Sequence, residues 1–181
     1  MNFKVLKLTP SICFFCLVTI VACTGNHKKS AKQPNIQSRE FQDKLIDANK
    51  MYVKRESDEI DQYIAHKGWL MTTTGTGLRY LITKKGAGEL AKLEQRAKVN
   101  YKISLLDGTL CYSSEVTGPK EFLIGRDNVE SGLHEGIQYM HLGDKAILIL
   151  PSYMAHGLIG DESKVPPHAS VVYELELLSL R

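Results

Sequence analysis

Cysteine and histidine are the residue types of this chain that could act as redox groups, nucleophiles or metal ligands. Cys13 and Cys16 have the spacing of a redox pair, and His134 and His141 lie near two helical turns apart. The cysteines fall inside an apolar N-terminal segment, and no carboxylate joins the histidines at a standard ligand spacing. Because the sequence also contains no Ser-His-Asp signature and no phosphate-binding glycine loop, we predict neither a metal nor a cofactor.

The first 22 residues form a separate segment. Lys4 and Lys7 are followed, without any acid, by an apolar stretch over 12–22. This is the pattern of a secretory signal, and the stretch is too short for a membrane span. The run Ile20-Val21-Ala22-Cys23 is similar to a bacterial lipobox, so we predict that residues 1–22 are removed and that Cys23 carries a lipid.

Removal of this segment changes both the cysteine count and the charge. Two of the four cysteines are cleaved off and Cys23 is acylated, so Cys111 alone remains and a disulfide within one chain is excluded. Cys111 is either a redox-sensitive thiol or a small apolar side chain, and a single half-buried cysteine favours the second interpretation. The formal net charge falls from +3 to about +1, so we expect no nucleic acid partner.

The residues after Cys23 indicate where the chain resides. Thr24-Gly25-Asn26-His27 has no acidic signal for the cell surface, which favours the periplasmic side. We therefore expect a lipid-anchored envelope protein that faces the periplasm, with the outer membrane as its membrane. The polar residues 23–37 are predicted to be a flexible linker, and the alternative is that the basic tract at 27–32 touches anionic headgroups.

A helical extension is predicted over 38–77. Ser38 can cap a helix, and the polar stretch after it carries an apolar stripe made of Phe41, Leu45, Ala48 and Tyr52. This helix, over about 38–66, could pack on its own domain, pair with a second copy as a homodimer, or dock on an envelope partner. Packing on its own domain is the interpretation that we favour.

The sequence beyond residue 77 predicts an α+β domain. Strands are expected at 78–83, 97–106, 145–150 and 171–180, with a hairpin turn at Asp107-Gly108. Helical spacing relates Val129, Leu133, Ile137 and Met140, so one short helix is expected between the strands. We predict a curved antiparallel sheet wrapped on this helix.

Five short motifs occur in the order expected for one known family. They are Leu106-Asp107-Gly108-Thr109, Phe122-Leu123-Ile124-Gly125, the run from Gly132 to Ile137, Leu142-Gly143-Asp144-Lys145 and Val165-Pro166-Pro167-His168-Ala169. Together they make residues 78–181 resemble the FK506-binding-protein (FKBP) family of peptidyl-prolyl isomerases. The resemblance implies a domain that speeds cis–trans exchange at X-Pro bonds of polypeptide clients without a cofactor.

The resemblance also places site residues. The implied catalytic positions are Tyr101, Leu133, His156 and Tyr173, and the implied substrate-binding positions are Cys111, Tyr112, Val129, Glu130 and Val165. Glu130 would hold a ligand carbonyl through its backbone N–H, and His156 stands where a tyrosine usually donates. The pair Cys111-Tyr112 replaces the usual Phe-Asp, and Lys164 replaces an apolar residue, so we expect catalysis to be weakened.

The lipobox, the short helix, the altered site and the entry sequence from Thr73 to Tyr80 are most similar to the gliding-motility-associated FKBP-type lipoproteins of the Bacteroidetes. This resemblance implies a role in folding or assembling exported proteins. Two hypotheses remain open at this point. The first is an isomerase, and the second is a non-catalytic binding or chaperone module for a motility or secretion assembly.

Overall fold

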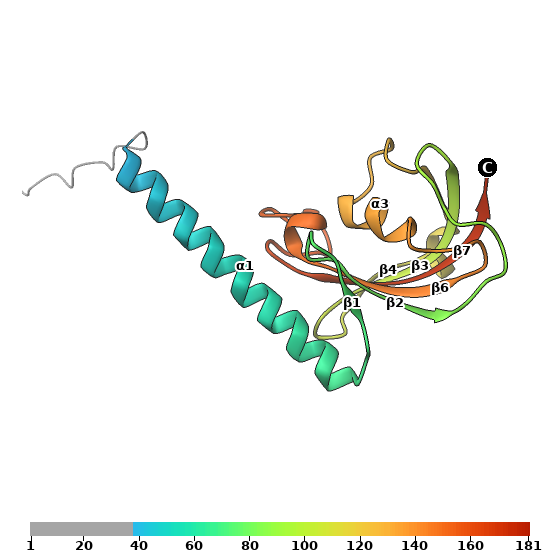
Figure 1. Ribbon diagram of the computed structural model, residues 1–181, viewed down its shortest axis with the longest axis horizontal. Helices are drawn as coiled ribbons and strands as arrows, with labels where there is room; N and C mark the ends of the chain where they lie inside the picture. Colours follow the sequence, from blue (N-terminus) through green and yellow to red (C-terminus); the bar gives the residue numbers. More distant parts are fainter. Residues whose placement is uncertain (1–37) are drawn as a thin grey trace, which may run out of the picture.

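The computed structural model describes residues 38–181 (Figure 1). The predicted signal segment 1–22, the predicted lipidation site Cys23 and the predicted linker 23–37 lie outside the described residues. In chain order the elements are α1 (Arg39–Lys67), β1 (Thr72–Thr73), β2 (Arg79–Lys84), β3 (Arg96–Leu105), β4 (Leu110–Ser113), α2 (Ser114–Thr117), β5 (Lys120–Leu123), α3 (Ser131–Ile137), β6 (Lys145–Leu150), the 3-10 turn η1 (Ser152–Met154) and β7 (Val171–Leu180).

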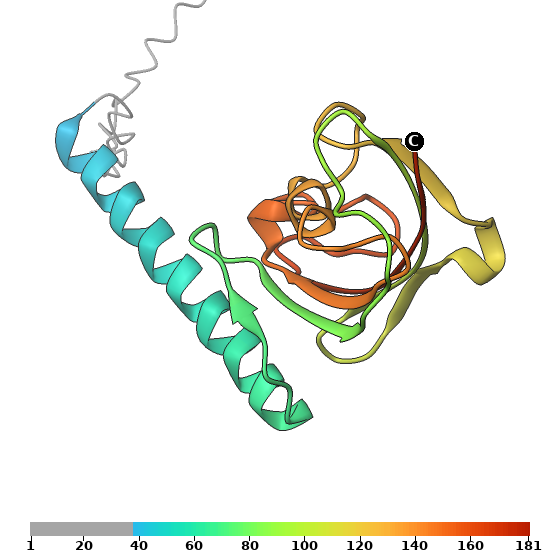
Figure 2. The same cartoon turned by 45° about the vertical axis from the view of Figure 1, so that its right-hand side comes forward.

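The strands form one antiparallel sheet in the order β1-β2-β6-β7-β3-β4, and β5 pairs with β3 beside β4. The sheet curves around α3, as Figures 1 and 2 show. This confirms the predicted fold class, and β2, β3, β6 and β7 lie within one or two residues of the predicted strands. The sequence does not reveal β1, β4 and β5, because strands of two to four residues are too short to show a clear alternation.

The main core lies between α3 and the concave face of the sheet. Ile103 of β3 lies opposite Tyr173 of β7, and both side chains are buried in this core. Leu133 and Ile137 of α3 are buried against the same face. Each large apolar side chain stabilises the fold by roughly 1.5–3 kcal/mol when it is fully buried. The residues that the sequence predicts for the site therefore share their surroundings with the core.

The glycines of α3 let this helix approach β6 closely. A Cβ added to Gly136 would overlap the Cδ1 of Leu148, which is fully buried and cannot move aside freely. We expect Gly136→Ala to lower the free energy of unfolding by about 1–2 kcal/mol, because the overlap outweighs the gain in helix propensity. Urea denaturation followed by circular dichroism measures this loss. Gly75→Ala is the matched control, since nothing lies within 4 Å of its Cβ position. An unchanged midpoint for Gly136→Ala would mean that α3 can shift away.

α1 is a 29-residue helix whose C-terminal half, together with Tyr52 just before it, packs on the domain. Ser38 caps its first turn, and Gly68 ends it in a left-handed conformation with φ +67°. In Figure 1 the N-terminal half points away from the sheet. In the other half, Ile60 is fully buried in a small apolar cluster with Ile149 of β6. Packing on its own domain is thereby confirmed for the C-terminal half. Within residues 38–181 the structure contains no helix with an apolar run that could span a bilayer.

The predicted extension over 38–77 contains two different parts. α1 occupies 39–67, and β1 then pairs with β2, with Thr72 opposite Tyr80. The entry sequence from Thr73 onward is therefore the edge of the sheet and not more helix. The domain boundary at residue 77 stays a prediction.

Candidate functional site

The structure brings the predicted site residues together beside the N-terminal end of α3. Cys111, Leu133, Val165 and Tyr173 are buried in the main core, and Tyr101, Tyr112 and Val129 pack against it. The two polar members, Glu130 and His156, contact each other. Residues from β3, β4, α3, β7 and the loop between β6 and β7 thus form one cluster, which we call the candidate site.

Two tyrosines on the paired strands β3 and β7 supply its aromatic part. The hydroxyl of Tyr101 lies 2.8 Å from the Thr117 Oγ1, and its backbone N–H donates to the Ser114 Oγ at 3.0 Å. Tyr173 is only 1% exposed, and its hydroxyl has no hydrogen-bond partner among the described residues. Burial raises the pKa of Tyr173 well above its usual value, and the nearby Glu130 carboxylate raises it further. Tyr173 therefore stays a neutral hydrogen-bond donor.

A buried carboxylate faces this aromatic part. Glu130 stands just before α3, and its side chain, which makes no capping bond, is 10% exposed. Its Oε1 lies 3.3 Å from the Nε2 of His156, and its Oε2 has no partner within residues 38–181. The sequence analysis assigns a role only to the backbone N–H of Glu130 and none to its side chain. No described backbone carbonyl accepts from that N–H. An acidic residue next to the apolar Val129 was the only signal in the sequence for the buried charge.

His156 and Tyr173 give the site two buried polar atoms that make no hydrogen bond of good geometry with a described residue, although both lie beside the Glu130 carboxylate. The Nε2 of His156 is near Glu130 but makes no hydrogen bond of good geometry with a described residue. A histidine Nε2 that carries the proton and a tyrosine hydroxyl are both donors. The arrangement can therefore present two donors to a carbonyl group that enters the site.

A second carboxylate bonds to Tyr112, the residue that stands where the FKBP resemblance implies an acid. The Tyr112 hydroxyl donates to Asp161, whose Oδ1 also accepts from the N–H groups of Val165 and Ser163 at 2.7 and 2.9 Å. Burial by itself raises the pKa of Asp161, but the hydrogen bonds from Tyr112, Val165 and Ser163 lower it to about 2. Sequence reasoning missed Asp161. The short spacing from Asp161 to Ser163, typical of a side-chain turn, was the available signal.

Removing the Tyr112 hydroxyl should destabilise the domain at neutral pH. The ionised Asp161 stabilises the fold above its unfolded pKa of about 3.8, and this contribution is lost as the pH falls toward 2. We expect Tyr112→Phe to lower the free energy of unfolding by about 1 kcal/mol at pH 7, after allowance for solvent screening. The difference from wild type should shrink between about pH 4 and pH 2, and urea titrations at several pH values measure it. Tyr139→Phe is the control, and a pH-independent loss would contradict the role of Asp161.

Cys111 behaves as a small apolar side chain of the wall. Its Sγ lies 3.6 Å from the carbonyl oxygen of Lys164 and 3.8 Å from that of Thr109. Burial raises the pKa of the thiol, and Asp161 raises it further. Because a protonated thiol is a poor nucleophile, this environment favours the apolar interpretation over the redox one. The Lys164 ammonium lies 5.2 Å from the ring centroid of Tyr112 and covers that ring.

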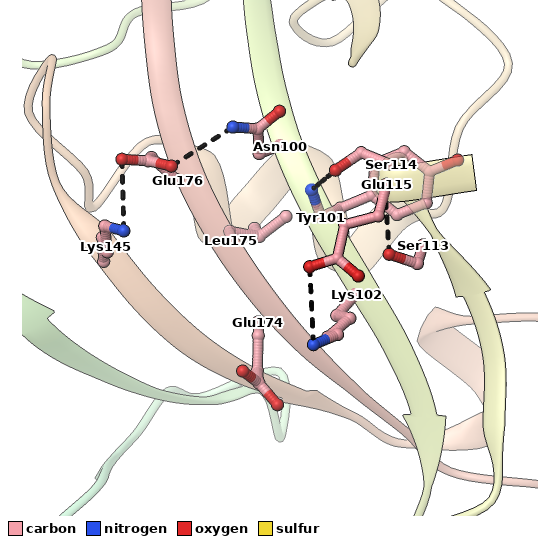
Figure 3. A pocket seen from close by; sticks show the side chains of 10 residues that line it. All are labelled: Asn100, Tyr101, Lys102, Ser113, Ser114, Glu115, Lys145, Glu174, Leu175 and Glu176. Carbon is pink, nitrogen blue, oxygen red and sulfur yellow. Dashed lines mark hydrogen bonds and ion pairs between the residues drawn. The ribbon is translucent and has the colours of Figure 1, made fainter. Parts of the chain in front are cut away.

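A cavity of about 310 Å³ lies along β3 and β7, and Tyr101 of the candidate site is one of its lining residues (Figure 3). Its charged lining residues alternate along these strands with the residues that face the core. Lys145 lies 3.3 Å from Glu176, which also accepts from the Asn100 amide at 3.2 Å, and Lys102 lies 3.8 Å from Glu115. Because these groups pair with one another, we assign no ligand to this cavity.

The histidine of α3 has a structural role. The Nδ1 of His134 accepts from the N–H of Gly125 at 2.8 Å, and its Nε2 lies 2.9 Å from the carbonyl oxygen of Asp127. Both ring nitrogens are thus engaged by the loop before α3. Within the part of the chain that the structure describes, no three His, Cys, Asp or Glu side chains form a group that could hold a metal ion.

Residues 88–178, just over half of the chain, match the family described as FKBP-type peptidyl-prolyl cis-trans isomerase. This chain belongs to that family. The matched FKBP region contains the whole candidate site from Tyr101 to Tyr173 and begins well after the end of α1. α1 is therefore an addition to the part that defines the FKBP family.

Individual relatives agree with this assignment. The chain is 29% identical over 145 residues to the probable FKBP-type peptidyl-prolyl cis-trans isomerase FkpA of Neisseria meningitidis, and this covers 78% of the chain and 53% of that relative. The chain thus spans about half the length of this curated relative. The crystal structure of FkpA from Escherichia coli superposes with a TM-score of 0.59 at 26% identity, over 80% of this chain and 73% of that one. A peptidyl-prolyl isomerase from Pseudomonas syringae gives a TM-score of 0.62 at 27% identity, over 72% and 94%.

Proposed function

We propose that this chain is a peptidyl-prolyl cis–trans isomerase that acts on X-Pro bonds of polypeptides. The observation that carries the proposal is the composition of the candidate site within the matched FKBP region. Leu133 and the ring of Tyr173 provide buried apolar surface, and the unpartnered Nε2 of His156 and hydroxyl of Tyr173 lie beside it. This is the combination of apolar surface and aimed donors that the reaction needs.

Rotation about a peptide bond faces a barrier of ~18–20 kcal/mol because twisting removes the amide resonance. The twisted amide is less polar than the planar one, so an apolar wall that excludes water favours it. Tyr101, Leu133 and Tyr173 would supply this wall for the proline ring. A donor aimed at the neighbouring carbonyl, such as His156, would hold the segment in place while the bond turns. The reaction requires no nucleophile, and Cys111 does not provide one.

The same site contains features that favour weak turnover. Cys111 is a small side chain at the wall, and Glu130 places a carboxylate beside the ring of Tyr173. An apolar proline that enters must approach this carboxylate without satisfying it, which costs free energy. These features also support the second candidate function, a binding or chaperone module that holds a client without catalysis.

An isomerisation assay separates the two candidates. The purified full chain in mild detergent is added to proline tetrapeptides with different residues before the proline, and the rate of cis–trans exchange is followed. If the chain is an isomerase, the exchange should be faster than the uncatalysed reaction. The uncatalysed reaction takes tens of seconds or longer. Perturbation of site resonances by the same peptides in NMR, without any acceleration, would establish the binding module in its place.

We further propose that the chain is anchored in the cell envelope by a lipid on Cys23, faces the periplasm from the outer membrane and acts on exported proteins. The lipobox-like run before Cys23 supports this location, and the similarity to gliding-associated lipoproteins stays a prediction. Cys23→Ser should move the protein from the membrane fraction to the soluble fraction and abolish incorporation of labelled palmitate, because a single residue carries the anchor. Cys111→Ser is the matched control, and an unchanged distribution of the Cys23 variant would contradict the anchor.

The free half of α1 is proposed to contact either a second copy or an envelope partner. Leu45 and Ile46 are about half exposed and Met51 is 74% exposed on this part of the helix. Analytical ultracentrifugation of the full chain tests pairing directly. A concentration-dependent dimer that Leu45→Glu disrupts would support the second copy, and a monomer at all concentrations would leave the partner protein as the occupant to be sought by cross-linking in cells.

A further inference from the structure

A buried carboxylate connects α1 to the domain. Glu56 is 4% exposed, although most of its neighbours along α1 are exposed. Its Oε1 accepts from the backbone N–H of Ser152 and from the Oγ of Ser170, both at 2.7 Å, and its Oε2 accepts from the Oγ of Ser152 at 3.2 Å. A buried carboxylate is unfavourable unless it is hydrogen-bonded, and these three donors compensate Glu56.

The two serines stand at opposite ends of the loop that carries part of the candidate site. Ser152 begins η1 shortly before His156, and Ser170 directly precedes β7 with Tyr173. The loop 152–170 between them is also tied internally. The N–H of Gly157 donates to the Ser152 carbonyl at 2.7 Å, and the N–H of His168 donates to the Gly157 carbonyl at 3.0 Å. One side chain of α1 therefore holds both ends of this loop.

A neighbouring residue of α1 contacts the same loop. The hydroxyl of Tyr52 donates to the carbonyl oxygen of His168 at 3.1 Å, and the two rings pack edge to face with centroids 4.8 Å apart. The helix is also fixed to β2, because the guanidinium of Arg79 lies 3.0 Å from the Asp61 carboxylate. The side-chain hydrogen bonds of Arg79 go to Gly77, Ser57 and Asp61, and none of them involves loop 152–170. Glu56 thus attaches α1 to the ends of loop 152–170, and Asp61 attaches it separately to β2.

We infer that Glu56 is a positioning residue of the candidate site. By holding Ser152 and Ser170 together, it sets loop 152–170 so that His156 and Tyr173 face the same substrate. α1 is then part of the site, even though it lies outside the matched FKBP region. The inference rests on the proposed isomerase function for its activity readout, and it makes a structural statement that does not depend on activity.

The test compares Glu56→Gln with Asp61→Asn in the full chain. Glu56→Gln keeps the size of the side chain but removes its charge and replaces one acceptor by a donor. We expect kcat/KM for a proline tetrapeptide to fall about tenfold, mainly through kcat, because small displacements of aligned groups have large effects on rate. Asp61→Asn weakens the attachment of α1 to β2 without touching the loop, and its kcat/KM should stay within twofold of wild type. Equal losses in both variants, or no loss in a folded Glu56→Gln protein, would overturn the inference.

Hydrogen exchange provides the readout that is independent of catalysis. In Glu56→Gln the amides of Gly157 and His168 should exchange at least tenfold faster than in wild type, while amides of β3 should be unchanged. Asp61→Asn should leave the amides of the loop protected. If wild type shows no isomerase activity but this pattern appears, the proposed function has failed and the positioning role stands. If the loop amides keep their protection in Glu56→Gln, the positioning role has failed whatever the activity.

Discussion

Replacing Glu130 by isoleucine should raise kcat/KM for a tetrapeptide with an apolar residue before proline by about tenfold. The carboxylate of Glu130 is 10% exposed, and its Oε2 has no partner among the described residues. An entering apolar segment removes the remaining water from this charge and offers it no hydrogen bond. An unsatisfied buried polar group costs about 1–3 kcal/mol, and each 1.4 kcal/mol corresponds to a factor of ten in rate or affinity.

Two companion variants separate the causes of this effect. Glu130→Gln removes the charge but keeps the polar shape, so it should give a smaller gain than isoleucine. Glu135→Gln removes a carboxylate of α3 that bonds to Thr76 away from the site, and it should leave kcat/KM unchanged. The folding of α3 is not at risk, because the Glu130 side chain makes no capping bond. A fall in kcat/KM for Glu130→Ile would mean that the carboxylate assists the reaction, for example by fixing the ring of His156.

The fold could be predicted from the sequence where the pattern is long and local. The alternation along β3 and the helical spacing from Leu133 to Met140 each predict an element that the structure contains. β4 and β5 escape prediction because they are short and are defined by pairing with β3. The apolar residues of the candidate site can be predicted from the resemblance to the FKBP family. They lie in or near short runs of consecutive residues, which can be recognised in the sequence.

The polar residues of the site escape prediction for a different reason. The bonds of Glu56 join residues that are 96 and 114 positions apart, and the bond from Tyr112 to Asp161 spans 49 positions. On an otherwise solvated helix, a glutamate that is destined for burial looks the same as its exposed neighbours. Only the tertiary structure shows that loop 152–170 closes over Glu56. The long-range polar contacts of Glu56 and Asp161 therefore cannot be predicted from the sequence.

Replacing Tyr101 by alanine should abolish most of the isomerase activity while the domain stays folded. The ring of Tyr101 is partly buried and packs against the main core, so we expect its removal to open the apolar wall to water. We expect kcat/KM to fall by about a hundredfold, since a solvated wall no longer favours the twisted amide. The truncation should also lower the free energy of unfolding by about 2–4 kcal/mol, because the ring is only partly buried. Peptide isomerisation and urea denaturation on the same samples measure both quantities.

Tyr101→Phe is the matched control for this substitution. It keeps the ring and removes only the hydroxyl that lies 2.8 Å from Thr117, outside the apolar wall. If Tyr101 contributes to catalysis through its apolar ring, Tyr101→Phe should retain at least a third of the wild-type kcat/KM. Equal losses in both variants would shift the catalytic role from the ring to the hydroxyl. Full activity in a folded Tyr101→Ala protein would remove β3 from the site, and the reaction would then have to rely on β4, α3, β7 and loop 152–170.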